Sequence, residues 1–291
     1  MKNILLIIAR VAFIVLAFTL VFRRIKVDAL FSHIMQANLL LVLLALVLQN
    51  ASLICSALRS RFYFNSYGLR VRKRFAIAYY YVGTLFNTIL PGGISGDGYK
   101  VYLLWKLEKF SKLLGLRLML YERVNGFYVL AFMGLLVLLP SSYIELFPYE
   151  LPLAIACIIL ITPCYLFGVK YVMRDKIAIA WGASYYSFFV QLLQVLSALV
   201  LVKALITEPT MQQYIDYIVL FIAASIATII PISVGGAGLR ELTFLYGIQL
   251  MPVSDVETGV AFAMINFFLY LLTAIPGIPL FYKIGKIKRV K

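Results

Sequence analysis

The sequence predicts an all-α, polytopic membrane protein. Of its 291 residues, 63% are hydrophobic and only 13% are charged, whereas about 45–50% of a soluble domain is apolar. Apolar runs recur from residue 4 to residue 282, and a stretch rich in proline and glycine occurs twice. We therefore expect about six spanning helices plus two re-entrant helical hairpins in an inverted repeat. Residues 1–291 should form a single integral membrane domain.

Six apolar stretches are long enough to cross a bilayer, which takes about 20 residues. The first is interpreted as a retained helix, because Arg23 and Arg24 follow it and no Ala-x-Ala cleavage site is present. The third continues a helix that starts near Lys112. The six stretches are 4–22, 37–58, 124–140, 151–169, 178–202 and 256–282.

The distribution of lysine and arginine predicts the orientation, because short cytoplasmic loops carry an excess of both residues. The segment 59–74 is rich in cations, as are 170–176 and the C-terminal tail, so all three should be cytoplasmic. The segment 141–150 has glutamates and no cation, so it should lie outside. Both termini are then cytoplasmic. The region 23–36 should be an outer loop, although its three cations depart mildly from the rule.

Two further apolar segments do not fit as simple spans. By the same count, 75–105 begins and ends on the cytoplasmic face, and 214–250 begins and ends outside. Each should be a re-entrant hairpin. Three spanning helices separate them, so the second copy is inverted and the two tips should meet near the midplane. The alternative is that these segments are ordinary spans.

The tips of the two hairpins carry nearly the same motif. Thr88–Lys100 aligns without a gap on Thr228–Arg240. Each copy ends a helix with proline, loosens the backbone with glycine and then presents a cation. Unwound backbone at this depth is tolerated only where protein or a wet cavity satisfies it. The motif residues are Pro91, Gly92, Gly93, Gly96, Pro231, Ser233, Gly235, Gly236 and Gly238.

Charged residues cluster at these tips and on the helix that leads to Pro140. A charge near the bilayer centre costs roughly 2.5–3.5 kcal/mol, so these residues should face the interior and have partners. We expect Arg123 to pair with Asp97, leaving Lys100 and Arg240 less fully neutralised. Two such cations beside the N-termini of restarting helices would bind an anion. The alternative is that ion pairs only attach the hairpins to the bundle. The candidate binding residues outside the motif glycines and prolines are Asn87, Asp97, Lys100, Glu122, Arg123, Arg240 and Glu241.

Other residues give weaker signals. Gln191 and Gln194 are three apart on one helix and are expected to face a cavity, although interhelical hydrogen bonding would explain them equally well. His33 lacks a neighbouring cluster of ligands, and no GxSxG, HExxH or P-loop motif is present, so we expect no metal, no cofactor and no catalytic residue. The net charge of +15 comes from short clusters between apolar runs, which favours lipid headgroups over nucleic acid as partners.

An ordered set of motifs resembles the lysylphosphatidylglycerol synthase transmembrane-region family, also described as flippase-like integral membrane proteins. The resemblance spans nearly the whole chain. It lies in Arg59, Asn87, Leu90-Pro91-Gly92-Gly93, Gly96-Asp97, Glu122-Arg123 and the run from Pro231 through Ser233, Gly235, Gly236 and Gly238 to Arg240-Glu241. In that family the domain occurs fused to a soluble aminoacyl-transferase domain. It also occurs alone, often beside glycolipid or polyprenyl-linked glycosyltransferases.

The resemblance implies translocation without aminoacyl-transfer chemistry. We expect a multi-pass protein of the cytoplasmic (inner) membrane that flips an anionic or aminoacylated phospholipid, or a polyprenyl-linked lipid. No ATPase motif is present, so transport would be passive or driven by an ion gradient. Two alternatives remain open: a membrane-embedded transferase acting on a lipid headgroup, with Asp97 or Glu122 as general base, and a non-catalytic partner subunit of a glycosyltransferase. A glycosyltransferase or an aminoacyl-lipid synthase is the expected protein partner.

Overall fold

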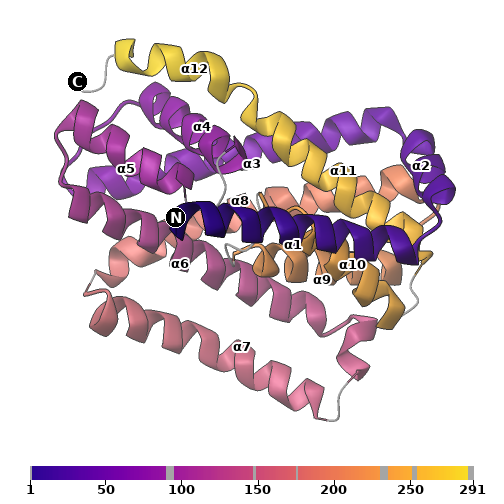
Figure 1. Cartoon of the computed structure of the whole chain (residues 1–291). Coiled ribbons are helices and arrows are strands. Elements are labelled where there is room, and N and C mark those ends of the chain that lie inside the picture. Colours follow the sequence, from indigo (N-terminus) through magenta and orange to yellow (C-terminus); the bar gives the residue numbers. More distant parts are fainter. Residues whose placement is uncertain are drawn as a thin grey trace.

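The structure is a computed structural model, and its described part is a bundle of helices without strands (Figure 1). It describes residues 2–89, 95–146, 149–174, 176–229, 235–250 and 254–287, without the side chains of 2–11, 95 and 150. Of the predicted site residues, Pro91, Gly92, Gly93, Pro231 and Ser233 lie outside the described residues.

In the described part of the chain, five helices are long and apolar enough to cross a membrane. They confirm five of the six predicted spans and make the protein a polytopic membrane protein. The remaining predicted span, 4–22, lies within helix α1 (Lys2–Arg24), which is not one of these five. The five are α3 (Leu39–Ser66), α6 (Lys112–Leu138), α7 (Glu150–Phe167, continued by the π-helix Gly168–Val172), α8 (Ile177–Leu205) and α11 (Val256–Ala274, continued by α12, Gly277–Lys283).

The region 23–36, predicted as an outer loop from its place between two spans, contains helix α2 (Val27–Gln36), and its position outside stays a prediction. Packing explains the helix. Leu30 is fully buried in a small core with Leu245 and Val260. The N–H of Lys26, just before the helix, donates a hydrogen bond of 3.0 Å to the carboxylate of Glu257. The count of lysine and arginine, on which the prediction for 23–36 was based, carries no information about this burial.

The two predicted hairpins are pairs of short helices. The first pair is α4 (Lys73–Ile89) and α5 (Ser95–Glu108), and the second is α9 (Met211–Ala227) and α10 (Leu239–Leu250). At about 1.5 Å per residue, helices of 12 to 17 residues are shorter than the roughly 30 Å hydrocarbon core. Within each pair the helices pack on each other. The pairs lie toward opposite ends of the long helices (Figure 1).

The first pair depends on glycine for its close approach. A Cβ atom at Gly96 would lie 2.1 Å from the carbonyl oxygen of Gly83, so only glycine allows the present spacing of α4 and α5. The side-chain oxygen of Asn87 accepts a hydrogen bond of 2.8 Å from the N–H of Gly96. Asn87 thereby joins the end of α4 to the start of α5.

The second pair uses its glycines differently. Gly236 and Gly238 have φ angles of +88° and +86°, a left-handed conformation that side chains disfavour. Helix α10 begins only after them, at Leu239. In the aligned first copy, helix α5 already begins at Ser95. The second copy therefore stays non-helical for four residues longer.

Two apolar cores occupy the two ends of the bundle. One joins the C-terminal part of α3, at Tyr63 and Phe64, to α4 and α5. The other joins the N-terminal part of α3, at Ala45, to α9, α10 and α11. The middle of the long helices lies between these cores, and the polar side chains gather there.

Candidate functional site

Polar side chains form a stripe along one face of α3. Gln49, Ser52, Ser56 and Arg59 are three, four and three residues apart in an otherwise apolar helix. This spacing places them on one side. Helix α8 repeats the same spacing with Ser184, Ser187, Gln191 and Gln194. The two stripes give the middle of the bundle a polar interior.

The stripes border a cavity of about 300 Å³. Its walls come from α3, α6, α8 and α11, from Tyr80 on α4, and from Thr228 and Arg240 of the second helix pair. Both short pairs therefore contribute to one cavity. The lining residues that carry charged or polar side chains are Gln49, Ser56, Arg59, Tyr80, Glu122, Arg123, Gln191, Gln194, Ser225, Thr228, Arg240, Asn266 and Tyr270.

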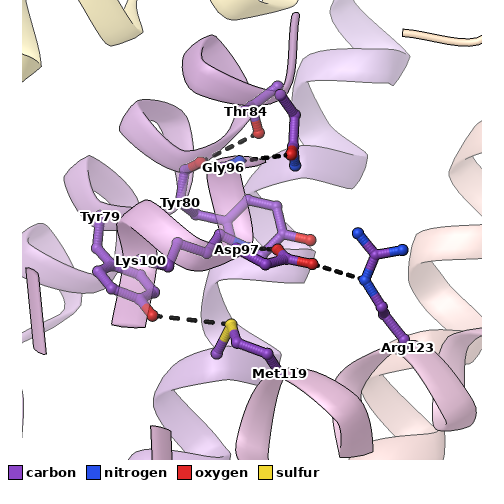
Figure 2. Close-up of polar contacts among 9 residues, drawn as sticks. Tyr79, Tyr80, Thr84, Gly96, Asp97, Lys100, Met119 and Arg123 are labelled. Carbon is purple, nitrogen blue, oxygen red and sulfur yellow. Dashed lines mark hydrogen bonds and ion pairs between the residues drawn. The ribbon is translucent and has the colours of Figure 1, made fainter. Parts of the chain in front are cut away.

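The first pair holds a compact ionic cluster (Figure 2). The Nε atom of Arg123 lies 2.6 Å from a carboxylate oxygen of Asp97, which confirms the predicted ion pair. The other oxygen of Asp97 lies 3.5 Å from Nζ of Lys100. Lys100 was expected to be less neutralised, but its side chain is 4% exposed and its Nζ also lies 3.9 Å from the centre of the Tyr80 ring. Lys100 is thus sealed within the first pair, behind the cavity wall.

Arg240 of the second pair has a different environment. It lines the cavity, and its guanidinium lies 5.3 Å from the ring centre of Tyr270 and 5.9 Å from that of Phe267. Among the described residues, no carboxylate lies within the 4.0 Å limit of an ion pair with it. Its neighbour Glu241 is fully buried and accepts a hydrogen bond of 2.7 Å from the N–H of Gly238. Glu241 therefore caps the start of α10.

Arg59 enters the cavity wall from α3 through a chain of hydrogen bonds. It donates to the hydroxyl of Ser187 over 2.7 Å, and Ser187 in turn donates to the side-chain oxygen of Asn125. The amide of Asn125 donates to Ser184 and to Tyr165, each over 2.7 Å. This chain links α3, α8, α6 and α7 and fixes the direction of the Arg59 guanidinium.

Three buried polar atoms in the cavity lining have no hydrogen-bond partner among the described residues. They are Nε of Arg59, Oε1 of Glu122 and Oε1 of Gln191. Buried polar atoms in proteins are nearly always satisfied by protein, water or ligand. The cavity therefore presents a donor and two acceptors suited to a polar ligand. Among the described residues, no group of three or more His, Cys, Asp or Glu side chains is placed to hold a metal ion.

The structure divides the predicted site residues into two groups. Glu122, Arg123 and Arg240 line the cavity. The others that are described are not part of its lining: Asn87, Gly96, Asp97, Lys100, Gly235, Gly236, Gly238 and Glu241. Gln191, Gln194 and Asn266 line the cavity as well.

Sequence reasoning missed Gln49 and Tyr270 and gave Arg59 no binding role. The signal for Arg59 and Gln49 was present, because a polar residue at every third or fourth position of an apolar spanning helix indicates a cavity-facing side. The stripe on α3 has that pattern. Tyr270 had no such signal, since aromatic residues are common throughout the chain.

Comparison with known families agrees with this architecture. The model of the family described as "Lysylphosphatidylglycerol synthase TM region" matches residues 7–277, which is most of the chain. The protein belongs to this family, as the resemblance in the sequence indicated. Membership supports a multi-pass membrane protein related to lipid handling. No curated protein is significantly similar to the chain.

Proposed function

We propose that the protein translocates lipids with an anionic headgroup across the cytoplasmic membrane, and that the cavity is the headgroup site. One observation carries the proposal. Halfway along the long helices, the described lining of the cavity contains three arginines and one glutamate, and both short helix pairs reach it. Membership in a family associated with lipid handling supports the same conclusion.

The charges of the lining favour an anion. Arg59 and Arg240 have no carboxylate in ion-pair contact among the described residues, whereas Arg123 is already paired with Asp97. A guanidinium binds a phosphate through two parallel hydrogen bonds, which is stronger than a neutral contact. At an effective dielectric constant lower than that of water, the attraction is larger still. The phosphodiester of a phospholipid or a polyprenyl phosphate provides this chemistry.

Glu122 extends the range of headgroups. Its unpartnered carboxylate oxygen lies in the same lining as the arginines. An aminoacylated phospholipid has an amine close to its phosphate, and a carboxylate would accept hydrogen bonds from that amine. The proposed substrates are therefore anionic phospholipids, their aminoacylated forms and polyprenyl-linked lipids.

The arrangement of the two pairs suggests how access would alternate. We interpret α4–α5 and α9–α10 as re-entrant pairs that enter the single membrane domain from opposite faces, as an inverted repeat. Movement of one pair against the long helices would open the cavity to one leaflet. Movement of the other would open it to the opposite leaflet. The arginines of the cavity would bind the headgroup while it crosses, and the lipid tails would remain in the hydrocarbon of the bilayer.

Lipid translocation in proteoliposomes tests the proposal. The rate at which fluorescent phosphatidylglycerol becomes accessible on the other face is measured for wild type, Arg240→Gln and Arg70→Gln. Arg70 is exposed and lies outside the cavity, so its variant makes the same charge change elsewhere. Loss of one charge-assisted hydrogen bond, worth about 1.5–3 kcal/mol, should slow Arg240→Gln by about tenfold or more. Equal rates for the three proteins would contradict the proposal.

A further inference from the structure

One buried carboxyl group next to the cavity has no part in the proposed headgroup site. Glu241 is fully buried, and its Oε2 accepts the hydrogen bond of 2.7 Å from the N–H of Gly238. The other oxygen, Oε1, is buried without a hydrogen-bond partner among the described residues. Buried polar atoms are nearly always satisfied by protein, water or ligand. Oε1 therefore needs a partner that the described part of the protein does not supply.

The surroundings of this carboxyl are apolar. Glu241 lines a hollow of about 350 Å³ between α10, α1, α2 and α11. The rest of the described lining consists of Phe18, Ile34 and five residues of α11, all with hydrocarbon or methionine side chains. Helix α1 packs on α10 (Figure 1), and a Cβ atom at Gly238 would lie 2.7 Å from the side chain of Ala17. No side chain in this lining can donate a hydrogen bond to Oε1.

The other ionisable groups near α10 do not reach Oε1 either. Helix α10 packs on α1, α9 and α11, and α2 completes the hollow. No ion pair within 4.0 Å joins Glu241 to its neighbour Arg240. The remaining ionisable side chains that are described on these five helices, none of which is bonded to Oε1, are Arg23, Arg24, Asp28, His33, Tyr214, Asp216, Tyr217, Tyr246, Glu257 and Tyr270.

Two kinds of ligand could satisfy Oε1, an amine or a proton. An ammonium group brings three donors, whereas the hollow offers one unpartnered acceptor among its described lining residues. The ammonium would therefore bury N–H groups without partners. A proton on Oε1 converts the carboxylate into an uncharged acid, which is far less costly to bury in apolar surroundings. The chemistry of the hollow favours the proton.

We propose that Glu241 binds a proton whose uptake is coupled to the binding of an anionic headgroup at Arg240, so that one proton crosses with each lipid. This inference rests on the proposed function. The two residues are consecutive at the start of α10. When Glu241 is ionised, its charge offsets that of Arg240. When Glu241 is protonated, Arg240 attracts the anion with its full charge.

The coupling acts in both directions. A proton on Glu241 strengthens the binding of the anion, so by linkage a bound anion strengthens the binding of the proton by the same factor. Both sites are on α10, directly after the left-handed residues Gly236 and Gly238, so a movement of the second pair would carry both. The proton would be taken from water in the cavity on one face and returned to water on the other, with only an O–H bond formed and broken. A proton gradient would thus drive translocation.

Proton uptake during lipid binding tests this proposal with the full chain in detergent. Wild type is titrated with phosphatidylglycerol in weakly buffered solution that contains a pH indicator. We expect uptake of up to about one proton per bound lipid, and an affinity that falls by up to about tenfold per pH unit as the pH rises. Glu241→Gln should show neither effect, because the amide does not titrate. Binding to wild type without proton uptake anywhere between about pH 5 and 9 would overturn the proposal.

Three variants assign the proton to one residue. Glu241→Asp retains an acid and should retain the uptake, which separates the loss of titration from a loss of folding. Glu122→Gln removes the carboxyl that lines the cavity, and Glu145→Gln changes an exposed glutamate; both should retain the uptake. Uptake that disappears in Glu122→Gln and persists in Glu241→Gln would overturn the assignment.

A transport measurement gives the same answer by another route. In proteoliposomes, a pH difference of about one unit should hold phosphatidylglycerol about tenfold more concentrated in the leaflet on the alkaline side, because one proton moves with each lipid in the same direction. Equal leaflet concentrations in wild type under this gradient would overturn the proposal. The gradient should not produce this asymmetry in Glu241→Gln.

The outcome is separable from that of the proposed function. Lipid binding that depends on Arg240 but takes up no proton would overturn the role of Glu241 and leave the headgroup site. Proton uptake that depends on Glu241 but is unchanged in Arg240→Gln would remove the headgroup from Arg240, and the coupling between the two residues with it.

Discussion

The two short helix pairs carry aligned motifs but hold their cations in opposite ways. In the first pair, Asp97 binds both Lys100 and Arg123, and Lys100 is sealed against Tyr80. In the second pair, alanine (Ala237) stands where the first has Asp97, and Arg240 lines the cavity with no carboxylate in contact among the described residues. A carboxylate present in the first copy alone, together with the earlier start of α5, separates a neutralised cation from an available one.

The difference suggests a division of work between the copies. The ionic cluster ties the first pair to α6 through Arg123, so this pair acts as an anchor. The second pair reaches the cavity with an arginine that lies over two aromatic rings, and under the proposed function this pair would be the binding arm. If the two copies were symmetric, both cations would be paired with a carboxylate or neither would be. The following predictions break or sharpen this comparison, from the largest expected effect to the smallest.

Removing the carboxylate of the first pair should have the largest effect on stability. Asp97→Ala leaves Lys100 buried without its partner, and breaking a buried ion pair in this way costs about 3–5 kcal/mol. We expect a strongly lowered midpoint of thermal unfolding in detergent and poor yield. Glu241→Gln is the matched control in the second pair, because it keeps the size and the capping oxygen and should change the midpoint much less. Similar midpoints for wild type and Asp97→Ala would show that the cluster does not anchor the pair.

The aligned glycines should respond in opposite ways. Gly98→Ala meets no atom within 4 Å inside a helix, so it should be neutral or stabilising by up to about 1 kcal/mol. Its aligned partner Gly238 has a φ of +86°, and Gly238→Ala should cost about 1–2 kcal/mol through left-handed backbone alone. Thermal unfolding of both variants measures the difference.

Gly96→Ala should also destabilise the protein, by about 1–3 kcal/mol, because the added methyl group would push α4 away from α5. A destabilised Gly98→Ala would contradict the helical start of α5.

Placing an aspartate at position 237, as in the first pair, should neutralise the charge of Arg240 in the second pair. In Ala237→Asp the new carboxylate lies three residues before Arg240 in sequence, in the turn that precedes α10, whereas Asp97 and Lys100 share helix α5. Neutralising Arg240 should lower the translocation rate of phosphatidylglycerol about tenfold, which corresponds to 1.4 kcal/mol. Ala237→Asn is the matched control, because it is similar in shape and uncharged. If both variants transport equally, charge at this position does not matter.

Making the first tip resemble the second should have the smallest effect. Asn87 aligns with Ala227, and Asn87→Ala removes the hydrogen bond to the N–H of Gly96. A net loss of about 0.5–1.5 kcal/mol is expected, visible as a modest fall in the unfolding midpoint. Asn65→Ala, at an exposed end of α3, is a comparable change outside the tip and should have less effect.

Much of this fold could be predicted because bilayer physics constrains it strongly. Length and hydropathy located five spans, and the count of lysine and arginine located both short pairs. The helix α2 was missed because its apolar face is small and its neighbours are distant in sequence. The pairing of Asp97 with Arg123 was predictable, since buried charges need partners.

The site was harder to predict because side-chain direction depends on where helices begin. Aligned positions suggested equal roles for Lys100 and Arg240. However, α5 begins four residues earlier in the alignment than α10, so Lys100 falls in the second turn and packs across Gly83. Glu241 was expected beside a ligand and instead caps α10. Where a glycine-rich segment returns to helix follows from its packing, which a single sequence does not reveal.

The most direct measurement compares the binding of anionic and zwitterionic lipid. Thermal stabilisation by phosphatidylglycerol and by phosphatidylcholine is measured on wild type, Arg240→Gln and Arg70→Gln, since a ligand that binds only the folded state stabilises it by RT ln(1 + [L]/Kd). Wild type and Arg70→Gln should prefer phosphatidylglycerol by about tenfold in affinity, or 1.4 kcal/mol, and Arg240→Gln should lose that preference. An unchanged preference in Arg240→Gln would contradict the assignment of the second pair as the binding arm.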